Sequence, residues 1–365
     1  MQFHQQPSTW RDGRPGFKVW VEHAGDRVSQ LEIAEIHIGL CGTEVRSAGI
    51  LDVETAPAHR RQGFGRFLME EALDLALREG FEISTLFGIP GFYHRFGYVS
   101  VGPSFEIWLS AGAVRDPASG MAIRPATDAD WPEIARIYAR ASADLNGAPM
   151  RDPASWPGPR QGSFWDVKPT TLAAVDARGS PVGYIMFDFE NNGMSITDAA
   201  FVDVDAAPVL LNAAARAAVD RGIEDMCFLL HPEKAFGDYL RRFPVRVKEQ
   251  RPHDTDDMAR LLDQRAVLQK VSGELRRRAW RAGADTPSSL TVRTDLGAAT
   301  VRLGGEAGPL SISLPQQGLI QLLYGYRTPA EIAGMPGAEI PSGALALLET
   351  VFPREDSYCD WPDRY

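Results

Sequence analysis

The sequence ILDVETAPAHRRQGFGRFLMEEALDLALREG, from Ile50 to Gly80, organises the N-terminal part of the chain. It predicts a strand (50–55), a short turn, and a long helix that ends at Gly80, because glycine is the usual residue at a helix stop. Apolar residues recur every three or four positions along the helix, which predicts one buried face. They are Phe64, Leu68, Met69, Ala72, Leu73, Leu75 and Ala76.

The turn before this helix carries the chemistry. Gly63 and Gly65 place no Cβ at the first helical turn, where backbone N–H groups have no partner within the helix. An anion can approach these groups closely, and the helix dipole favours it there. Arg60, Arg61 and Arg66 add positive charge suited to phosphate oxygens. The Walker nucleotide loop and the dinucleotide fingerprint both have other glycine patterns.

A strand leading into Arg60-x-x-Gly63-x-Gly65 resembles the coenzyme A pyrophosphate loop of the GNAT acetyltransferases. The alternative is an ordinary basic turn, and the preceding residues 52–57 (DVETAP) favour the coenzyme site. The resemblance implies acetyl-CoA as a co-substrate. It also implies that the coenzyme contacts Val53, Thr55, Arg60, Arg61, Gln62, Gly63, Phe64, Gly65 and Arg66.

A second motif follows the next predicted strand (81–87). The segment FYHRFGY, residues 92–98, resembles the end motif of the same family, whose first tyrosine is the general acid. The match implies that Tyr93 protonates the departing thiolate, and a phenol with a pKa of about 10 suits that role. The alternative is an aromatic core cluster, which is our interpretation of Phe92, Phe96 and Tyr98.

Length and composition limit the other possibilities. A chain of 365 residues suggests two or three domains, and 44% hydrophobic with 24% charged residues is typical of a globular protein. A net charge of −10 argues against a nucleic-acid partner. No apolar run or leader is recognisable, and three scattered cysteines fit a reducing compartment, so we expect a cytoplasmic protein without a membrane partner or metal site.

Two further units follow. Residues 121–250 repeat the order of an acetyltransferase fold, but only Asp205-Ala206-Ala207-Pro208 precedes its helix, so we expect a degenerate copy without a pyrophosphate site. Residues 251–365 resemble a sterol-carrier-like α+β domain, with a short helix expected over 257–264. The predicted fold class is α/β (α+β), with two GNAT-fold mixed sheets in tandem and this third domain.

Two acetyltransferase units followed by such a domain resemble the Eis family of N-acetyltransferases. That family uses the carboxylate of its own C-terminus as general base, which implies Tyr365 here, at the end of WPDRY. A terminal carboxylate has a pKa of about 3.5, so it is deprotonated at neutral pH. The alternative is a frayed terminus, against which the aromatic residues of the tail argue. The resemblance also implies a homo-oligomer, commonly a hexamer.

The predicted N-terminal acetyltransferase domain, residues 1–120, departs from the family at its start. Residues 1–16 predict irregular structure, where the family has a strand and two helices. The predicted function is acetyl-CoA-dependent acetylation of a primary amine, such as an aminoglycoside, a polyamine or a lysine side chain, by direct attack. The alternatives are a catalytically silent coenzyme A sensor or scaffold, and a lipid carrier that uses the C-terminal domain.

Overall fold

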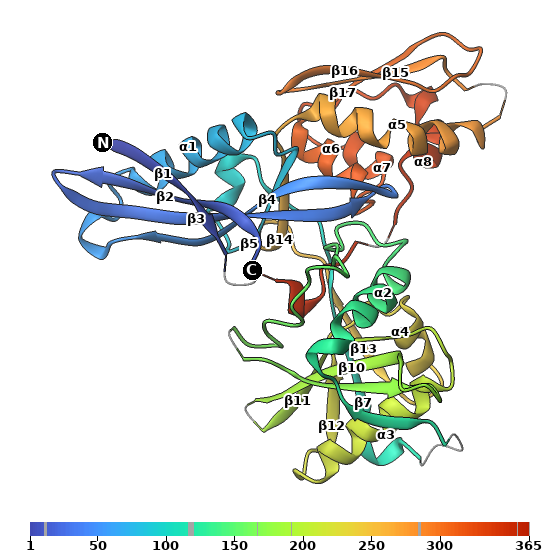
Figure 1. The fold of residues 1–365 in the computed structure, drawn as a ribbon. Coiled ribbons are helices and arrows are strands. Elements are labelled where there is room, and N and C mark those ends of the chain that lie inside the picture. Colours follow the sequence, from blue (N-terminus) through green and yellow to red (C-terminus); the bar gives the residue numbers. More distant parts are fainter. Residues whose placement is uncertain are drawn as a thin grey trace.

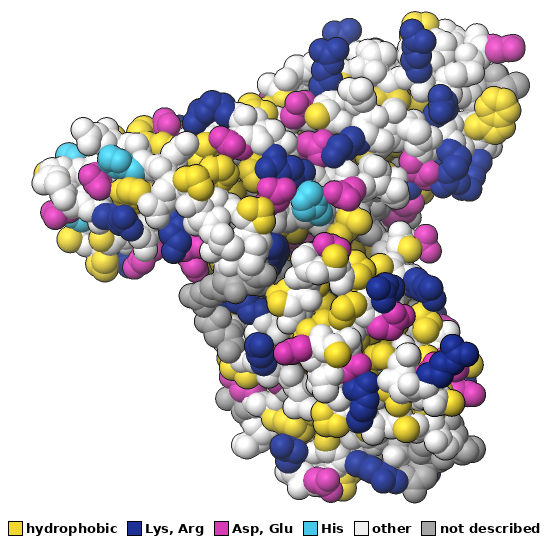
Figure 2. Space-filling view, viewed as in Figure 1, with side chains coloured by type: hydrophobic (Ala, Val, Ile, Leu, Met, Phe, Trp, Pro, Cys, Tyr) yellow, Lys and Arg dark blue, Asp and Glu magenta, His cyan; other side chains and the backbone are white. Residues whose placement is uncertain are grey.

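The computed structural model describes residues 1–10, 13–115, 120–165, 167–190, 192–283, 286–355 and 357–364. It shows a mixed α/β protein of three units, each built on its own sheet (Figure 1). Charges of both signs are interspersed over the face drawn in Figure 2. Among the described helices, none combines the length and the apolar composition that a membrane span requires.

The first unit is a seven-stranded sheet in the order β1-β2-β3-β4-β5-β14-β6. Helix α1 connects β4 to β5, which run parallel, and its apolar stripe packs on the sheet as the sequence predicts. The elements are β1 Gln2–Thr9, β2 Pro15–His23, β3 Asp26–Leu40, β4 Thr43–Thr55, α1 Phe64–Arg78, β5 Ile83–Gly88, β6 Val99–Ser100 and β14 Asp256–Leu261.

The second unit repeats this plan in the order β13-β7-β12-β11-β10-β9-β8. Helix α3 connects the parallel strands β11 and β12, just as α1 connects β4 and β5. The elements are β7 Ser104–Ser110, β8 Ala122–Pro125, α2 Trp131–Ala141, β9 Thr170–Val175, β10 Pro181–Glu190, β11 Gly193–Phe201, α3 Ala206–Val219, β12 Asp225–Phe228, α4 Ala235–Leu240 and β13 Arg246–Gln250.

The two sheets exchange a strand. After β6 the chain crosses to the second sheet, where β7 lies between β12 and β13. After β13 it returns, and β14 lies between β5 and β6. Each large sheet is therefore completed by a segment that the sequence assigned to another unit.

The third unit is a three-stranded sheet with helices against it. The elements are α5 Gln264–Trp280, β15 Ser289–Thr294, β16 Gly297–Arg302, β17 Leu310–Ser313, α6 Gln316–Leu323, α7 Pro329–Ala333 and α8 Leu345–Val351. It shares one continuous apolar core with the long β3–β4 hairpin of the first unit. Its likeness to a sterol carrier stays a prediction.

Two expectations about local structure are wrong. Residues 1–16 are not irregular, because Gln2–Thr9 forms the edge strand β1, whose polar side chains give no apolar alternation to recognise. Residues 257–264 are not a short helix, because Asp256–Leu261 forms β14. The pairing of β14 with β5 lies far away in sequence and decides its conformation. The helix α5 that follows is absent from the sequence-based expectation.

We expect residues 1–103 expressed alone to be unstable, because they lack β14. Met258 and Leu261 are fully buried, and losing both contacts costs about 3–6 kcal/mol. The open edge of β5 also invites aggregation. Circular dichroism melts and size-exclusion chromatography test this. A control fragment that appends residues 256–263 through a glycine-rich turn should melt at a higher temperature, and equal melting of both fragments would contradict the role of the exchanged strand.

Candidate active site

Strands β4 and β5 part in the middle of the first sheet. Their parallel pairing covers only Ser47–Gly49 and Ile83–Thr85, although the strands continue to Thr55 and Gly88. A β-bulge follows the last pair, and its Asp52 adopts a left-handed φ of 52°. Because a bulge bends its strand and increases the twist, the end of β4 turns away from β5 and opens the sheet.

The turn at the start of α1 lies at this opening. Gly63 has a φ of 89° and precedes the helix, a conformation that favours glycine. A Cβ on Gly65 would lie 3.1 Å from Thr55 Oγ1, so the missing side chain lets the helix start lie close against β4. The first N–H groups of the helix have no helical partners, and we predict that an anion binds them.

The three arginines of this turn differ in whether their guanidinium groups already have a partner within the protein. Arg60 Nε donates to the Thr55 carbonyl oxygen at 3.1 Å, and Arg66 forms an exposed ion pair with Glu70 at 2.8 Å. Arg61 has a left-handed φ of 62°, and its guanidinium has no partner among the described residues. Arg61 is therefore the cation most available for a phosphate.

Tyr93 lies on the other side of the opening, in a 3-10 turn (Tyr93–Phe96). Its ring packs edge-on against Phe92, with 4.9 Å between centroids, and only 9% of the residue is exposed. Burial raises the pKa of its phenol. The expected aromatic cluster is present, because Phe96 and Tyr98 are buried in the same core.

One cavity of about 510 Å³ brings the two motifs together. The turn and β4 form one wall and the Tyr93 segment forms the other. Of the site residues predicted from sequence, Gln62 does not line it, since its side chain donates to the Ala58 carbonyl oxygen at 3.1 Å. The lining residues are Val53, Glu54, Thr55, His59, Arg60, Arg61, Gly63, Phe64, Gly65, Arg66, Ile89, Phe92, Tyr93 and Arg95.

A second cavity, of about 320 Å³, lies at the end of β5. Gly88 lies in its wall, and a Cβ on Gly88 would lie 3.1 Å from the Tyr93 ring. Phe164 and Trp165 are 44% and 56% exposed at this cavity, unusual for such large apolar groups. Its other lining residues include Phe87, Thr255, Asp256, Trp361 and Arg364.

The C-terminal tail reaches this second cavity. In Figure 1 the tail runs from α8 to the junction of the two large sheets. Arg364 places its guanidinium 4.0 Å from the Trp361 ring centroid, and its carbonyl oxygen accepts a bond from Gln161 at 2.8 Å. Tyr365, the predicted general base, lies outside the described residues. Sequence reasoning missed Phe164, Trp165 and Asp256, although the tryptophan-rich loop (151–165) is itself a visible signal.

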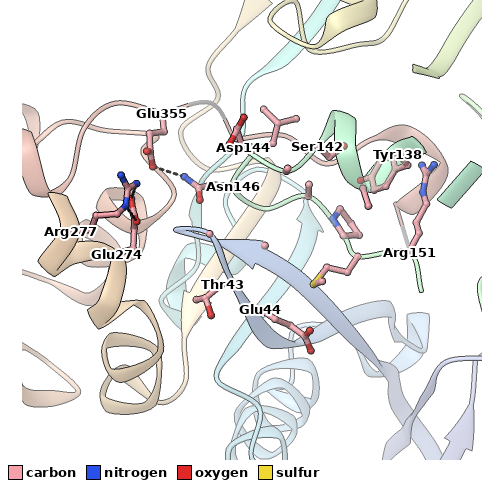
Figure 3. Close-up of a pocket in the computed structure, with 18 of the residues that line it drawn as sticks. Thr43, Glu44, Tyr138, Ser142, Asp144, Asn146, Arg151, Glu274, Arg277 and Glu355 are labelled. Carbon is pink, nitrogen blue, oxygen red and sulfur yellow. Dashed lines mark hydrogen bonds and ion pairs between the residues drawn. The ribbon is translucent and has the colours of Figure 1, made fainter. Parts of the chain in front are cut away.

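Another cavity, of about 380 Å³, lies between α2, the β3–β4 hairpin and α5 (Figure 3). Its charged groups largely neutralise one another. Arg278 bridges Glu274 and Glu355, both at 2.6 Å, and Asn146 also donates to Glu355. This cavity contains none of the residues predicted for the site.

The chain is similar to known proteins in part of its sequence and in its fold. Residues 5–101 match the family model of the acetyltransferase (GNAT) domain. Three crystal structures are similar over nearly the whole chain. A GCN5-related N-acetyltransferase from Kribbella flavida is 19% identical, with a TM-score of 0.70 over 97% of this chain and 88% of that one.

The second, a GCN5-related N-acetyltransferase from Anabaena variabilis, is 17% identical, with a TM-score of 0.71 over 95% of this chain and 89% of that one. The third, Eis1 from Mycobacterium abscessus, is 18% identical, with a TM-score of 0.65 over 97% and 90%. At such identities the likeness shows the fold. The search of curated proteins returned no match.

We expect Arg61→Ala to raise the Kd of coenzyme A by about tenfold, the loss typical of one charge-assisted hydrogen bond. Arg66→Ala should have a smaller effect, because Glu70 competes for that guanidinium. Titration calorimetry at low and high salt measures both, and the effect of Arg61 should shrink as salt screens it. Arg78→Ala, in the last turn of α1, is the matched control, and an equal loss in that variant would contradict a phosphate contact at Arg61.

Proposed function

We propose, from the premise that residues 5–101 form a GNAT acetyltransferase domain, that this enzyme transfers the acetyl group of acetyl-CoA to a primary amine. The observation that carries the proposal is the single cavity shared by the turn at the start of α1, the end of β4 and Tyr93. An ordinary basic turn would not require a buried phenol across an opening in the sheet.

The coenzyme fits this cavity in one direction. Its pyrophosphate binds the N–H groups at the start of α1 with Arg61 beside it. Its pantetheine arm then follows β4 towards the bulge, where the backbone N–H groups of Val53 and Thr55 bind its carbonyl oxygens. This places the thioester between the parted strands, where main-chain donors stabilise the charge that develops on the acyl oxygen.

The acceptor enters through the second cavity. Four aromatic side chains and the Asp256 carboxylate line it, and aromatic faces attract an ammonium group. Asp256 is shared with Arg364, whose Nη1 lies 3.4 Å away. A primary amine of an aminoglycoside, a polyamine or a lysine side chain has the required charge. In this arrangement the amine reaches the thioester from the end of β5, where Gly88 lines the second cavity and the next residue, Ile89, lines the first.

The reaction is a direct displacement. The amine nitrogen attacks the thioester carbon, the new C–N bond forms and the C–S bond breaks. The terminal carboxylate of Tyr365 takes the proton that the amine loses, and Tyr93 gives its phenolic proton to the thiolate. No covalent intermediate on the protein is required, so none of the three buried cysteines takes part.

We expect thiol release from acetyl-CoA in the presence of one amine class in a panel of aminoglycosides, polyamines, arylalkylamines and lysine peptides. Tyr93→Phe and deletion of Tyr365 should each lower kcat at least about tenfold, the lower end of general acid–base contributions, with the coenzyme Kd unchanged. Tyr239→Phe, which removes a partly buried phenol in the second unit, should leave kcat unchanged.

The other outcomes separate the alternatives. Loss of turnover in Tyr93→Phe alone would reject the terminal carboxylate as base and direct attention to Glu54 or a water. Tight coenzyme binding without turnover of any amine would favour a sensor or scaffold. Binding of fatty ligands that Arg61→Ala does not affect would favour a lipid carrier.

The pH profile gives an independent test. Because burial raises the pKa of Tyr93 above its ordinary value of 10, the phenol stays protonated through the mildly alkaline range. We therefore expect kcat to rise as the amine deprotonates and to show no alkaline fall up to about pH 9.5. A fall in kcat below pH 9 that disappears in Tyr93→Phe would contradict a phenol with a raised pKa.

A further inference from the structure

The second unit contains the same opening as the first. Its strands β11 and β12 pair in parallel only over Met194–Ile196 and Met226–Phe228, and β11 continues to Phe201. A bulge at Thr197 follows the last pair, as the bulge at Asp52 does in β4. The opening in the first unit is the cavity that we assign to the coenzyme. The equivalent opening in the second unit therefore raises the question of what fills it.

That occupant is the tail of the chain itself. Tyr358 is fully buried, and its hydroxyl donates to the carbonyl oxygen of Leu229, just beyond β12, at 2.8 Å. The 3-10 turn Trp361–Asp363 follows and contacts β11. The tail therefore contacts both strands that bound the opening.

Two buried ion pairs hold the tail there. Arg151 lies with Nη1 2.8 Å from Asp198 on β11 and Nη2 2.8 Å from Asp363 on the tail, and the three side chains are 1%, 0% and 6% exposed. Lys234, just before α4, lies 2.6 Å from Asp360. The guanidinium of Arg151 also stacks on Tyr138, 3.6 Å from its ring centroid, and Figure 3 shows the two side by side.

The start of α3 is unsuited to a coenzyme. It has no glycine turn: Asp203 lies three positions before the helix, as Arg61 does in the first unit, and Asp205 occupies the position of Gly63. A carboxylate at a helix start satisfies the dipole and repels a phosphate. The opening thus has two buried cations, Arg151 and Lys234, and acidic residues at the start of α3. Two buried cations suit a peptide segment that carries carboxylates, as the tail does at Asp360 and Asp363.

We propose that the opening of the second unit is the docking site of the C-terminal tail (Tyr358–Arg364), and that Arg151 and Lys234 are positioning residues for the acceptor cavity. Asp363 lies between Trp361 and Arg364, two residues that line the acceptor cavity. Its ion pair therefore fixes the backbone on which these two side chains are carried. The positioning role rests on the proposed acetyl transfer, whereas the docking itself does not.

Asp363→Asn tests this with little risk of unfolding. A buried charge left without a partner is strongly destabilising, but in this variant Arg151 keeps Asp198 and the nearby hydroxyl of Tyr184. We expect carboxypeptidase to release the last residues of the full-length variant at least tenfold faster than those of wild type. We also expect the KM of the amine to rise about tenfold, the size expected for losing one buried charge-assisted bond, with the coenzyme Kd unchanged.

The matched control is Asp130→Asn, which removes an ion-paired, buried carboxylate of the second unit that bonds Arg124 rather than the tail. It should change neither the protease rate nor the amine KM. An unchanged protease rate in Asp363→Asn would overturn the docking site. Faster release with an unchanged amine KM would overturn the positioning role. If wild type turns over no amine, the positioning role falls with the proposed function, and the protease rates alone decide the docking.

Discussion

In each of the two large sheets, one pair of parallel strands is paired over only three residues, and the rest of the structure depends on this constraint. Beyond Gly49 and Thr85, the main-chain groups on the facing edges of β4 and β5 no longer bond each other, and such groups need partners. In the second unit the equivalent gap is closed by Leu229 N, which donates to Ile196 at 2.8 Å, and by Tyr358 on the tail. In the first unit the gap remains a cavity. The same interruption of the parallel pairing therefore leaves a cavity in the first unit and is filled by the tail in the second.

The exchanged strands tie these two copies together. Because β14 completes the first sheet and β7 completes the second, the two openings are held at a fixed position relative to each other. The chain passes between the sheets twice within short segments, after Ser100 and after Gln250, which leaves little room for the units to move apart. The tail can therefore be anchored in one sheet and still deliver Arg364 to the end of β5 in the other.

Local patterns were sufficient where the chain's own neighbours decide the structure. The helix after the glycine turn and the Tyr93 segment follow from periodicity, turn residues and motif spacing. The failures share one cause. β1 and β14 are strands because they pair with β2 and β5, and their own residues do not reveal these partners. The strands that β7 joins are formed by residues more than a hundred positions later in the chain. The residues of the cavity proposed for the coenzyme could be named from the sequence because they lie within one stretch of 43 positions, from Val53 to Arg95. The cavity proposed for the acceptor is assembled from distant segments.

The two cavities differ in whether their residues lie in one stretch of the sequence or in several, and this difference decides which part of the site the sequence alone can describe. The residues that match the acetyltransferase model, 5–101, include the glycine turn, the bulge and Tyr93, so they contain the whole cavity proposed for the coenzyme. The acceptor cavity takes Phe164 and Trp165 from the second unit, Asp256 from the exchanged strand and Trp361 from the tail. Of its lining, only Phe87 and Gly88 fall inside the matched domain. Under the proposed acetyl transfer, the residues that contact the acceptor are therefore separate from those that contact the acetyl donor, and the motif around Gly63 carries no information about the acceptor.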